Sequence, residues 1–523
     1  MKTMRYSAAT LALLWAAIFS PLRQLSAQTV EKVADLTYAL DENDVYQGGY
    51  APAQRFTQVG TDLWFATQSG GTNGNKGTIS RFDLTTHQVV QVASLGADTG
   101  YTPSSELLVI GTEAYFTTTA GGTDGRGTVA KINLSSGVVT ALFSLPSTMA
   151  FGLNPLGTLT HIGDDLWVLS ALGGSSSLGV AFKYNLTSGT ATVVTNFNGS
   201  IQMGAEPFGG LVAAGADWYF TTLVGGSTWN TTNYTVITLP DGSTATITNK
   251  LQTGAGTLSK LSFDSLGNPV IATVVNLSGG YEQFPSSAPI LVGTNSLYFT
   301  TLGLLFPNVA PGAILRYDIA TGTYSNLFSF STNTSLSKVN GIHPGSASPT
   351  EWLGDLYLVN RNGGANAANL NSGGGTVIKF NLASNTVTKL ADLSSVTSAS
   401  GLGGPGGSVY ASGLVVQETN RFFIYQPLPS GGANGRGTII RIALPPPPIQ
   451  LQGGNTGGNA FTLTWTGGYP PFEVLTNTDL SAPAANWATA AANINATANT
   501  TNWSVSLPIS HENLFYRVRG QAW

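Results

Sequence analysis

Histidine, cysteine and paired carboxylates are the side chains best suited to metal and acid–base chemistry. The four histidines, His87, His161, His343 and His511, include no two at the spacing of zinc ligands. The lack of cysteine excludes disulfides, thiolate metal sites and a cysteine nucleophile. No Gly-x-Ser-x-Gly elbow, phosphate-binding loop or dinucleotide fingerprint stands between a strand and a helix. The sequence therefore predicts no catalytic residue, no metal site and no cofactor.

Carboxylates keep one enzyme hypothesis open. A secreted carbohydrate-active enzyme, either a polysaccharide lyase or a glycoside hydrolase, needs paired acids or a Tyr/His/Arg cluster that converges on one site. The first candidates are Asp44, Glu206, Glu282 and His343. Two of them within about 10 Å of each other would support this alternative. The main interpretation is a binding or scaffold protein.

Aromatic residues offer the better candidate surface. They gather in long connections that also carry a proline, and aromatic side chains with a few carboxylates suit a polysaccharide or a surface protein as partner. The predicted ligand-binding residues are Tyr46, Tyr50, Tyr101, Phe151, Glu206, Phe208, Tyr281, Glu282 and His343. The same aromatics could instead fill the centre of the fold as core.

A repeat must position these residues. A Tyr/Trp-Phe-Thr-Thr segment leads to a Gly-Gly pair, and the pairs that begin at Gly70, Gly121, Gly173 and Gly225 are 51 or 52 residues apart. A second motif, of the type Gly-Thr-Val-x-Lys-x-Asn-Leu, begins at Gly77, Gly127, Gly179, Gly256, Gly312, Gly375 and Gly437. In the second unit, strands are predicted over 106–110, 114–118, 128–134 and 138–145. Four short strands per unit are typical of a β-propeller blade.

The two ends of the repeat array complement each other. The seventh unit has predicted strands near 408–415, 421–425 and 438–444, but prolines follow in place of a fourth strand. Residues 30–36 (VEKVADL) are similar to the fourth strand of the sixth unit, 387–393 (VTKLADL). The sequence therefore predicts an all-β fold with a seven-bladed β-propeller over 28–444, closed by an N-terminal strand that covers an exposed edge.

A cation stands four residues after each motif glycine. These cations are Arg81, Lys131, Lys183, Lys260, Arg316, Lys379 and Arg441. With period-two alternation, Arg81 and Asp83 share one side of their strand. The pattern favours an ion pair or hydrogen bond to the adjacent blade or to the glycine loop; the alternative is a ring of ligand-binding cations.

The loop at 121–125 resembles calcium-binding glycine repeats, but it is the only such loop in this sequence with an aspartate, Asp124. A single carboxylate favours an ordinary turn over a calcium site.

The composition and the N-terminus indicate export. A net charge of −4 without any basic run argues against a nucleic-acid partner. Residues 1–27 resemble a signal peptide, with Lys2 and Arg5 before an apolar stretch over 8–19; an uncleaved anchor is the alternative. No later segment is apolar for long enough to span a membrane. We expect a monomer that is secreted or held at the cell surface, with the periplasm as a further location.

Two further segments depart from the repeat. After a proline linker at 445–448, residues 449–523 have predicted strands over 460–465, 472–476, 487–492, 502–507 and 514–519. They indicate a small immunoglobulin- or fibronectin-like β-sandwich, serving either as a spacer or attachment module or as a cap on the propeller. An insertion at 227–255 is predicted to form a hairpin about Asp241-Gly242, either on the working face or as a neutral embellishment.

The two repeat motifs together resemble the GloVer (Gloeobacter–Verrucomicrobia) tandem repeat over residues 30–444. That resemblance implies an exported bacterial protein with one of several C-terminal anchoring arrangements, and it implies no established activity. The Gly-Gly pair after a blade strand is also similar to kelch propellers, but the Tyr and Trp that follow it there are missing here.

If the N-terminal strand completes the last blade, deleting residues 30–40 should sharply lower the thermal midpoint of unfolding, because an edge of the array loses its partner strand. Differential scanning calorimetry of the full chain and of the deletion variant would measure this. An unchanged midpoint would count against closure.

Overall fold

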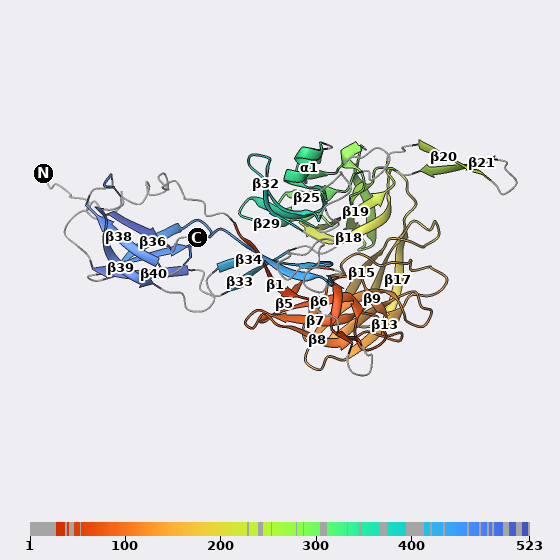
Figure 1. Ribbon diagram of the computed structural model, residues 1–523, viewed down its shortest axis with the longest axis horizontal. Coiled ribbons are helices and arrows are strands. Elements are labelled where there is room, and N and C mark those ends of the chain that lie inside the picture. Colours follow the sequence, from red (N-terminus) through yellow and green to blue (C-terminus); the bar gives the residue numbers. More distant parts are fainter. Residues whose placement is uncertain are drawn as a thin grey trace. The chain divides into compact units, whose positions relative to one another are not determined.

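The computed structural model describes residues 28–520 apart from several short gaps (Figure 1). The gaps are 37–38, 41–45, 53, 227–229, 239–243, 253, 279, 286, 304–310, 332, 345–347, 366–373, 394–412, 419–420, 432–434, 458–459, 470–471, 479–480, 484–485, 495–501 and 509–514. The chain divides into two compact units, one of residues 30–414 and 425–441, and the other of residues 1–29, 415–424 and 442–523. The predicted signal peptide lies outside the described residues.

Each repeat folds into one antiparallel sheet. The first contains β4 (Gly49–Pro52), β5 (Thr57–Val59), β6 (Asp62–Gly70), β7 (Thr78–Asp83) and β8 (Val89–Ser94). The second contains β9 (Tyr101–Pro103), β10 (Leu108–Ile110), β11 (Glu113–Ala120), β12 (Thr128–Asn133) and β13 (Val139–Ser144). The third contains β14 (Thr160–Ile162), β15 (Asp165–Ser170), β16 (Val180–Asn185) and β17 (Thr190–Asn196).

The later repeats follow the same order. The fourth sheet contains β18 (Ala205–Ala214), β19 (Asp217–Val224), β22 (Thr257–Phe263) and β23 (Pro269–Asn276). The fifth contains β24 (Ile290–Val292), β25 (Ser296–Thr301), β26 (Ala313–Asp318) and β27 (Thr323–Ser329). The sixth contains β28 (Ile342–Pro344), β29 (Thr350–Trp352), β30 (Asp355–Asn362), β31 (Thr376–Asn381) and β32 (Thr386–Asp392). The short elements β2 (Ala39–Leu40), β3 (Tyr46–Gln47), η3 (Gly280–Glu282) and α1 (Thr334–Asn340) lie between them.

The first strand of a repeat differs from the prediction. In the second repeat it is split, because β9 pairs with one end of β11 and β10 with the other. Between the two pieces, the Ser104 hydroxyl donates to the carbonyl of Pro155 in the next repeat, at 2.6 Å. The split therefore lies where a side chain contacts the next repeat, while the amide of Ser104 still donates to the carbonyl of Thr117 in β11 at 3.0 Å.

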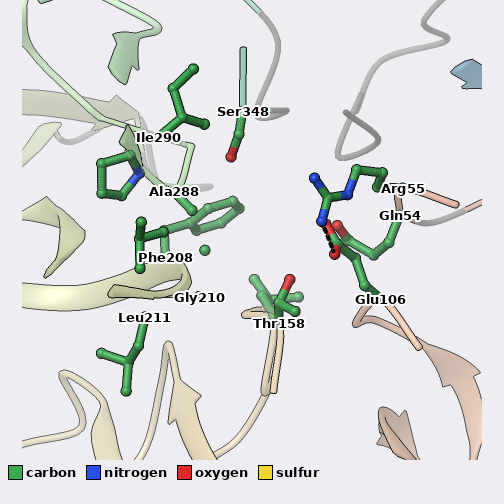
Figure 2. A pocket seen from close by; sticks show the side chains of 14 residues that line it. Gln54, Arg55, Glu106, Thr158, Phe208, Gly210, Leu211, Ala288, Ile290 and Ser348 are labelled. Carbon is green, nitrogen blue, oxygen red and sulfur yellow. Dashed lines mark ion pairs between the residues drawn. The ribbon is translucent and has the colours of Figure 1, made fainter. Parts of the chain in front are cut away.

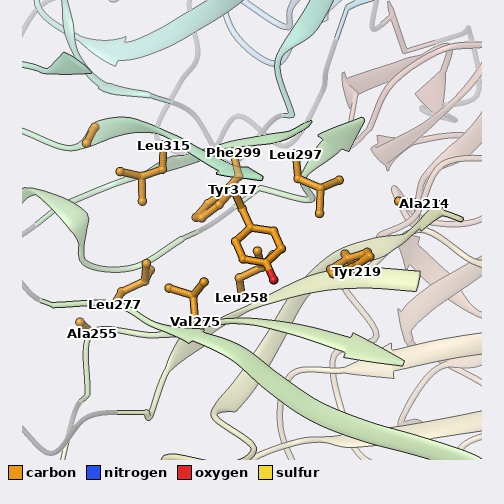
Figure 3. Packing of buried hydrophobic residues seen from close by; sticks show 11 residues of the cluster. Ala214, Tyr219, Ala255, Leu258, Val275, Leu277, Leu297, Phe299, Leu315 and Tyr317 are labelled. Carbon is orange, nitrogen blue, oxygen red and sulfur yellow. The ribbon is translucent and has the colours of Figure 1, made fainter. Parts of the chain in front are cut away.

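Neighbouring sheets share their hydrophobic cores. The third strand of each repeat, from β7 in the first to β35 in the last, alternates buried and half-buried positions near its end, as the pleat requires. Figure 3 shows Leu297 and Phe299 of the fifth sheet facing Tyr219, Leu258 and Val275 of the fourth. Comparable clusters join the first sheet to the second, the second to the third, the third to the fourth, and the fifth to the sixth. Each sheet is thus buried by the repeats that flank it.

The double glycine is a conformational requirement. Gly121 and Gly122 have φ values of 83° and 75°, which glycine adopts without the strain of a side chain. A Cβ atom on Gly121 would lie 2.7 Å from the Cα of Gly100. The recurrent pair therefore makes a tight turn against the connection that enters the same repeat.

The N-terminal strand β1 (Val30–Asp35) belongs to the last sheet of the array. The order there is β1, β35 (Thr438–Ala443), β34 (Arg421–Leu428) and β33 (Leu414–Glu418). The amide of Leu36 also donates to the carbonyl of Gly437, at 2.9 Å. The similarity between β1 and β32 extends to an ion pair, because Lys32–Asp35 and Lys389–Asp392 both lie at 2.8 Å.

Six strands follow the proline segment. They form two three-stranded sheets, one of β36 (Gln450–Gly457), β37 (Ala460–Thr466) and β40 (Asn502–Pro508), the other of β38 (Phe472–Asn477), β39 (Ala488–Ile494) and β41 (Phe515–Arg519). The first of these strands, β36, was not anticipated from the sequence. Leu463 and Trp465 from one sheet pack against Phe472 and Val474 from the other, so the two sheets share one core.

Tyr469 anchors the start of this segment. Its hydroxyl donates to the carbonyl of Leu444 at 2.9 Å and accepts from the amide of Phe422 at 3.0 Å. Burial raises the pKa of Tyr469 to about 12, so the hydroxyl stays protonated and able to donate. The amide of Gly468 donates to the carbonyl of Pro447 at 2.7 Å. The prolines are therefore held against the glycine turn that precedes β38.

The insertion forms the predicted hairpin. Strands β20 (Asn230–Thr238) and β21 (Thr244–Gln252) pair from Asn230 with Gln252 to Thr238 with Thr244. They make a separate two-stranded sheet, drawn in Figure 1 as a projecting arm. Within the described part of the chain, no helix is long and apolar enough to cross a membrane.

Leu36→Ala tests whether the N-terminal strand contributes to the core. Leu36 is 0% exposed, so its truncation should lower the free energy of unfolding by about 2–5 kcal/mol. Leu266→Ala is the control, because Leu266 is 84% exposed and should change stability by less than about 0.5 kcal/mol. Urea unfolding would compare them, and equal effects would contradict the burial of Leu36.

Candidate functional site

One residue in each of six connections adopts an unusual backbone conformation. These residues are Ala51, Thr102, Asn154, Glu206, Phe284 and His343, with φ between 50° and 59°. Each precedes a proline, which normally favours extended backbone in the residue before it. A left-handed conformation of a non-glycine residue costs on the order of 1–3 kcal/mol and persists only where the surroundings impose it.

A hydrogen bond to another repeat accompanies this conformation at five of the six residues. The amide of Thr102 donates to the carbonyl of Lys76 at 3.1 Å, and that of Glu206 to Leu178 at 2.8 Å. The same bond is made by Phe284 to Ala255 at 3.0 Å, by His343 to Pro311 at 2.9 Å and by Ala51 to Arg436 at 3.2 Å. Every acceptor immediately precedes a motif glycine. The two sequence motifs of the repeat are therefore joined across repeat boundaries.

The motif glycine makes room for the proline of the next repeat. A Cβ atom on Gly179 would lie 2.6 Å from Cδ of Pro207, and one on Gly256 would lie 2.6 Å from Cδ of Pro285. Such distances are too short for a side chain. This Gly–Pro contact, together with the amide bond beside it, holds the candidate connections in one repeated geometry.

Two of the predicted tyrosines have cations over their rings. Nζ of Lys76 lies 5.1 Å from the ring centroid of Tyr101, and Cζ of Arg436 lies 4.6 Å from that of Tyr50. Asn75 also donates to the Tyr50 hydroxyl at 3.1 Å. Both tyrosines are half-buried. Each ring therefore has a cation over one face, within cation–π distance.

Other predicted residues are placed differently. Phe151 packs against Phe143 and Phe182, with ring centroids 5.0 and 5.5 Å apart, so most of its ring serves the core between the second and third sheets. His343 is buried, and its Nδ1 lies 2.8 Å from the carbonyl of Leu302, to which it donates. The structure thus places His343 in the interior. Of Tyr46 only the strand is described, and Asp44 lies outside the described residues.

Glu282 and Tyr281 lie in the short helix η3. The carboxylate of Glu282 accepts hydrogen bonds from Ser278 at 2.7 Å, Tyr324 at 3.2 Å and Asn326 at 3.3 Å. Tyr324 and Asn326 belong to β27, the fourth strand of the fifth sheet. These bonds tie Glu282 to an outer strand, and Tyr281 beside it is exposed.

Glu206 is a predicted site residue whose carboxyl group is affected by burial. Its side chain is half-buried, and burial raises the pKa of the carboxyl above its usual value. The neighbouring Phe208, at the end of the same connection, is nearly buried and lines the cavity described below.

The recurrent cations are paired within their own sheets, and the expectation of partners in an adjacent blade or glycine loop is wrong. The pairs are Arg81–Asp62 at 2.6 Å, Lys131–Glu113 at 3.7 Å, Lys183–Asp165 at 2.7 Å, Lys260–Asp217 at 2.8 Å, Arg316–Asp318 at 3.1 Å and Lys379–Asp355 at 3.2 Å. In the last sheet, Arg441 pairs with Glu31 of β1. Except for Arg316–Asp318, which lies within β26, these are cross-strand pairs between side chains on one face of neighbouring strands.

The glycine loop around Asp124 is a turn. The carboxylate of Asp124 accepts from the amide of Ser147 at 2.7 Å, which is a structural bond. Among the described residues, no three His, Asp or Glu side chains are placed to hold a metal ion.

A small cavity lies where the inner strands of six repeats meet. Each of the six repeats contributes one equivalent residue to the lining. This residue stands two positions before the first-strand residue that pairs with an aromatic residue of the second strand. These equivalent residues are Arg55, Glu106, Thr158, Gly210, Ala288 and Ser348. The cavity has a volume of about 180 Å³. It therefore follows the repeat symmetry, although no residue of the first two repeats that lines it was among the predicted site residues.

The cavity wall is chemically uneven (Figure 2). Arg55 and Glu106 form an ion pair at 3.3 Å on one side, and the ring of Phe208 reaches in from the opposite side. The four other equivalent positions carry small side chains or none, which leaves the space open. A comparison of the aligned repeats at this one position could have found the site, because charge appears there in two adjacent units only.

Residues 29–237 match the model of the Gloeobacter/Verrucomicrobia repeat, which confirms the resemblance seen in the sequence motifs. The chain is thus an all-β repeat protein that carries this repeat. No curated protein sequence matches it.

Several solved structures are similar at low identity. An oligogalacturonate lyase from Vibrio parahaemolyticus is 11% identical with a TM-score of 0.43, over 80% of this chain and 99% of that one. The polysaccharide lyase Uly1 is 12% identical with a TM-score of 0.41, over 80% and 99%. An ancestral GH74 enzyme is 11% identical with a TM-score of 0.47, over 79% and 51%. At these scores the likenesses support no inference about activity.

Glu206→Gln should change how stability depends on pH. The folded-state pKa of Glu206 is raised above 4.5, so the stabilisation of its protonated form is present below that value and lost as the pH rises through the folded pKa. From about pH 4 to about pH 7, the wild type should therefore lose stability relative to the variant. Urea unfolding at several pH values measures this, and a constant difference would contradict it.

Proposed function

We propose that this chain is an exported binding protein that recognises a polysaccharide through the connections between its repeats. Its architecture in this proposal is a seven-bladed β-propeller over 28–444 closed by the N-terminal strand, followed by the linker 445–448 and a β-sandwich over 449–523. The signal peptide over 1–27 directs it to the cell surface or the surrounding medium, where it acts as a monomer.

Contacts between the first and last repeats support ring closure. The amide of Ala51 in the first repeat donates to Arg436 in the last, and the rings of Phe82 and Tyr425 lie 5.8 Å apart. The first of these is the same bond that joins the consecutive repeats. A closed array leaves no unpaired edge between its ends.

A constant backbone with variable side chains carries the binding proposal. The six strained positions hold Ala51, Thr102, Asn154, Glu206, Phe284 and His343 in one repeated conformation. The backbone conformation is thus the same at these positions, while the side chains differ in chemistry. Loops that carry function on a rigid fold have this arrangement. Retention of backbone strain at each of these positions supports the same conclusion.

The side chains near these positions favour a sugar ligand over a strongly charged one. Tyr50 and Tyr101 offer ring faces, Asn75 offers an amide, and charged residues are only 9% of the chain. Aromatic rings with a few hydrogen-bonding groups suit the apolar faces and hydroxyls of polysaccharides. A protein partner is the competing outcome of the experiment below.

The raised pKa of Glu206 is the observation that favours the alternative function, an enzyme. A raised pKa is a property of general acids, although glycoside hydrolysis also needs a second carboxylate. Release of new reducing ends or unsaturated sugars by the wild type, and its loss in Glu206→Gln, would favour the enzyme over the binding protein.

Binding of the full chain to an array of bacterial and plant polysaccharides would test the proposal. The variants Tyr50→Ala, Tyr101→Ala and Tyr281→Ala should each weaken binding by about ten-fold, as expected when a stacking contact is lost. Phe263→Ala is a matched control, because Phe263 is 38% exposed and Tyr281 is 37% exposed, yet Phe263 ends the third strand of its repeat. Absence of polysaccharide binding, or equal binding by all variants, would overturn the proposal.

A further inference from the structure

The cavity on the inner strands is a second feature that the loop surface does not explain. Its six equivalent wall positions include only two long side chains, Arg55 and Glu106, and these come from adjacent repeats. The other four are Thr158, Gly210, Ala288 and Ser348. A repeat array that only needed a filled centre could place a large apolar residue at each of these positions, and this one does not.

Hydrogen bonds between neighbouring repeats hold the lining of the cavity in place. Nε2 of Gln54 donates to the carbonyl of Ser104 at 2.7 Å, and the hydroxyl of Thr57 donates to Leu107 at 2.6 Å. On the other side, the hydroxyl of Thr160 donates to Leu211 at 3.2 Å. Because each bond crosses from one repeat to the next, the cavity lining is preorganised, which lowers the entropic cost of binding a small ligand.

The size of the cavity suits a single ring. At about 30 Å³ for each molecule of liquid water, a volume of about 180 Å³ holds roughly six waters. A single sugar ring displaces a comparable amount of water. A longer oligosaccharide would have to extend out of the cavity.

The charges on the wall select among sugars. The guanidinium of Arg55 can donate to ligand oxygens and the carboxylate of Glu106 can accept from ligand hydroxyls. Since the two charges compensate each other at 3.3 Å, an acidic sugar would have to compete with Glu106 for Arg55 and would be repelled by it. Vicinal hydroxyls of a neutral sugar can use both groups at once.

The opposite wall is apolar. Phe208 turns its ring toward the ion pair, with Leu211 and Ile290 beside it (Figure 2). The C–H face of a pyranose ring packs on such a surface, while its hydroxyl edge reaches the polar wall. Polar and apolar groups thus stand on the two sides that a sugar ring presents.

We propose that this cavity binds one neutral sugar residue, held by Arg55 and Glu106 on its hydroxyl edge and by Phe208 on its apolar face. The inference rests on the proposed polysaccharide recognition and identifies which part of the ligand reaches the centre of the repeat array. It makes the ion pair a specificity determinant against uronic acids.

Isothermal titration of the full chain with glucose, galactose and mannose, and with glucuronate and galacturonate, tests the proposal. At least one neutral sugar should bind with a Kd on the order of millimolar, and both uronates should bind about ten-fold more weakly or not at all. The double variant R55Q/E106Q should weaken binding of the neutral sugar by about ten-fold or more, because charge-assisted hydrogen bonds are lost. Ser348→Phe, which fills the cavity, should abolish it.

A matched control separates ligand contact from stability. Arg81–Asp62 is an ion pair of similar exposure in the first sheet, outside the cavity lining, so R81Q/D62N should leave sugar binding unchanged. Thermal unfolding identifies any variant that has lost its fold, and Ser348→Phe then stands as the independent test. Tighter binding of uronates, or unchanged binding in both cavity variants, would overturn the inference.

The two proposals fail in different ways. If polysaccharides bind and the tyrosine variants weaken that binding, but no free sugar enters the cavity, only the cavity inference is wrong. If free neutral sugars bind in a manner that depends on Arg55 and Glu106, while the tyrosine variants bind polysaccharide normally, the loop surface is wrong and the cavity stands.

Discussion

The contact between a motif glycine and the proline of the following repeat is the constraint on which the array depends. At Gly179, Gly256 and Gly312 it brings the connection so close to the preceding repeat that a single Cβ atom would not fit. The adjacent amide-to-carbonyl bond then holds the residue before the proline in a left-handed conformation. These repeats are therefore held to the preceding one where the chain enters their first strand.

Core formation follows from this docking. The sheets have apolar side chains on the faces that meet, and neither face could be buried by the sheet alone, as in other repeat proteins. Stability must therefore come from the interfaces between neighbouring repeats. The last sheet has no fourth strand from its own repeat, and β1 supplies one through strand pairing and through Glu31, which pairs with Arg441.

Because the backbone is held in this way, side chains at some positions can differ between repeats without disturbing the fold. Connection residues and the inner cavity positions differ from repeat to repeat, while the Gly–Pro contact and the buried threonines beside it recur. Thr67 and Thr78 lie 2.8 Å apart in the first sheet, and Thr222 and Thr257 lie 2.7 Å apart in the fourth. Side chains of different chemistry can thus be presented without altering the backbone that supports them.

Sequence patterns predicted the strands well where the pattern is local. The strands β11, β12 and β13, the insertion hairpin and five of the six C-terminal strands all lie close to their predicted ranges, because period-two alternation and turn residues are properties of short segments. The split first strand was missed, since only its register against β11 shows that β9 and β10 pair with opposite ends of that strand. The partners of the cations were expected in the adjacent blade or the glycine loop, and only the pairing of β6 with β7 brings Asp62 of the same sheet next to Arg81.

By itself, the sequence determined the all-β repeat, its length and the kinship of β1 with a fourth strand, because these depend on periodicity within one chain segment. Only the tertiary structure decided which residues meet. It buried His343, packed Phe151 against Phe182, tied Glu282 to an outer strand, and gathered Arg55, Glu106 and Phe208 around one cavity from three separate repeats. Spacing along the chain carries no information about convergence across an array, since equivalent positions come together only when the repeats pack side by side.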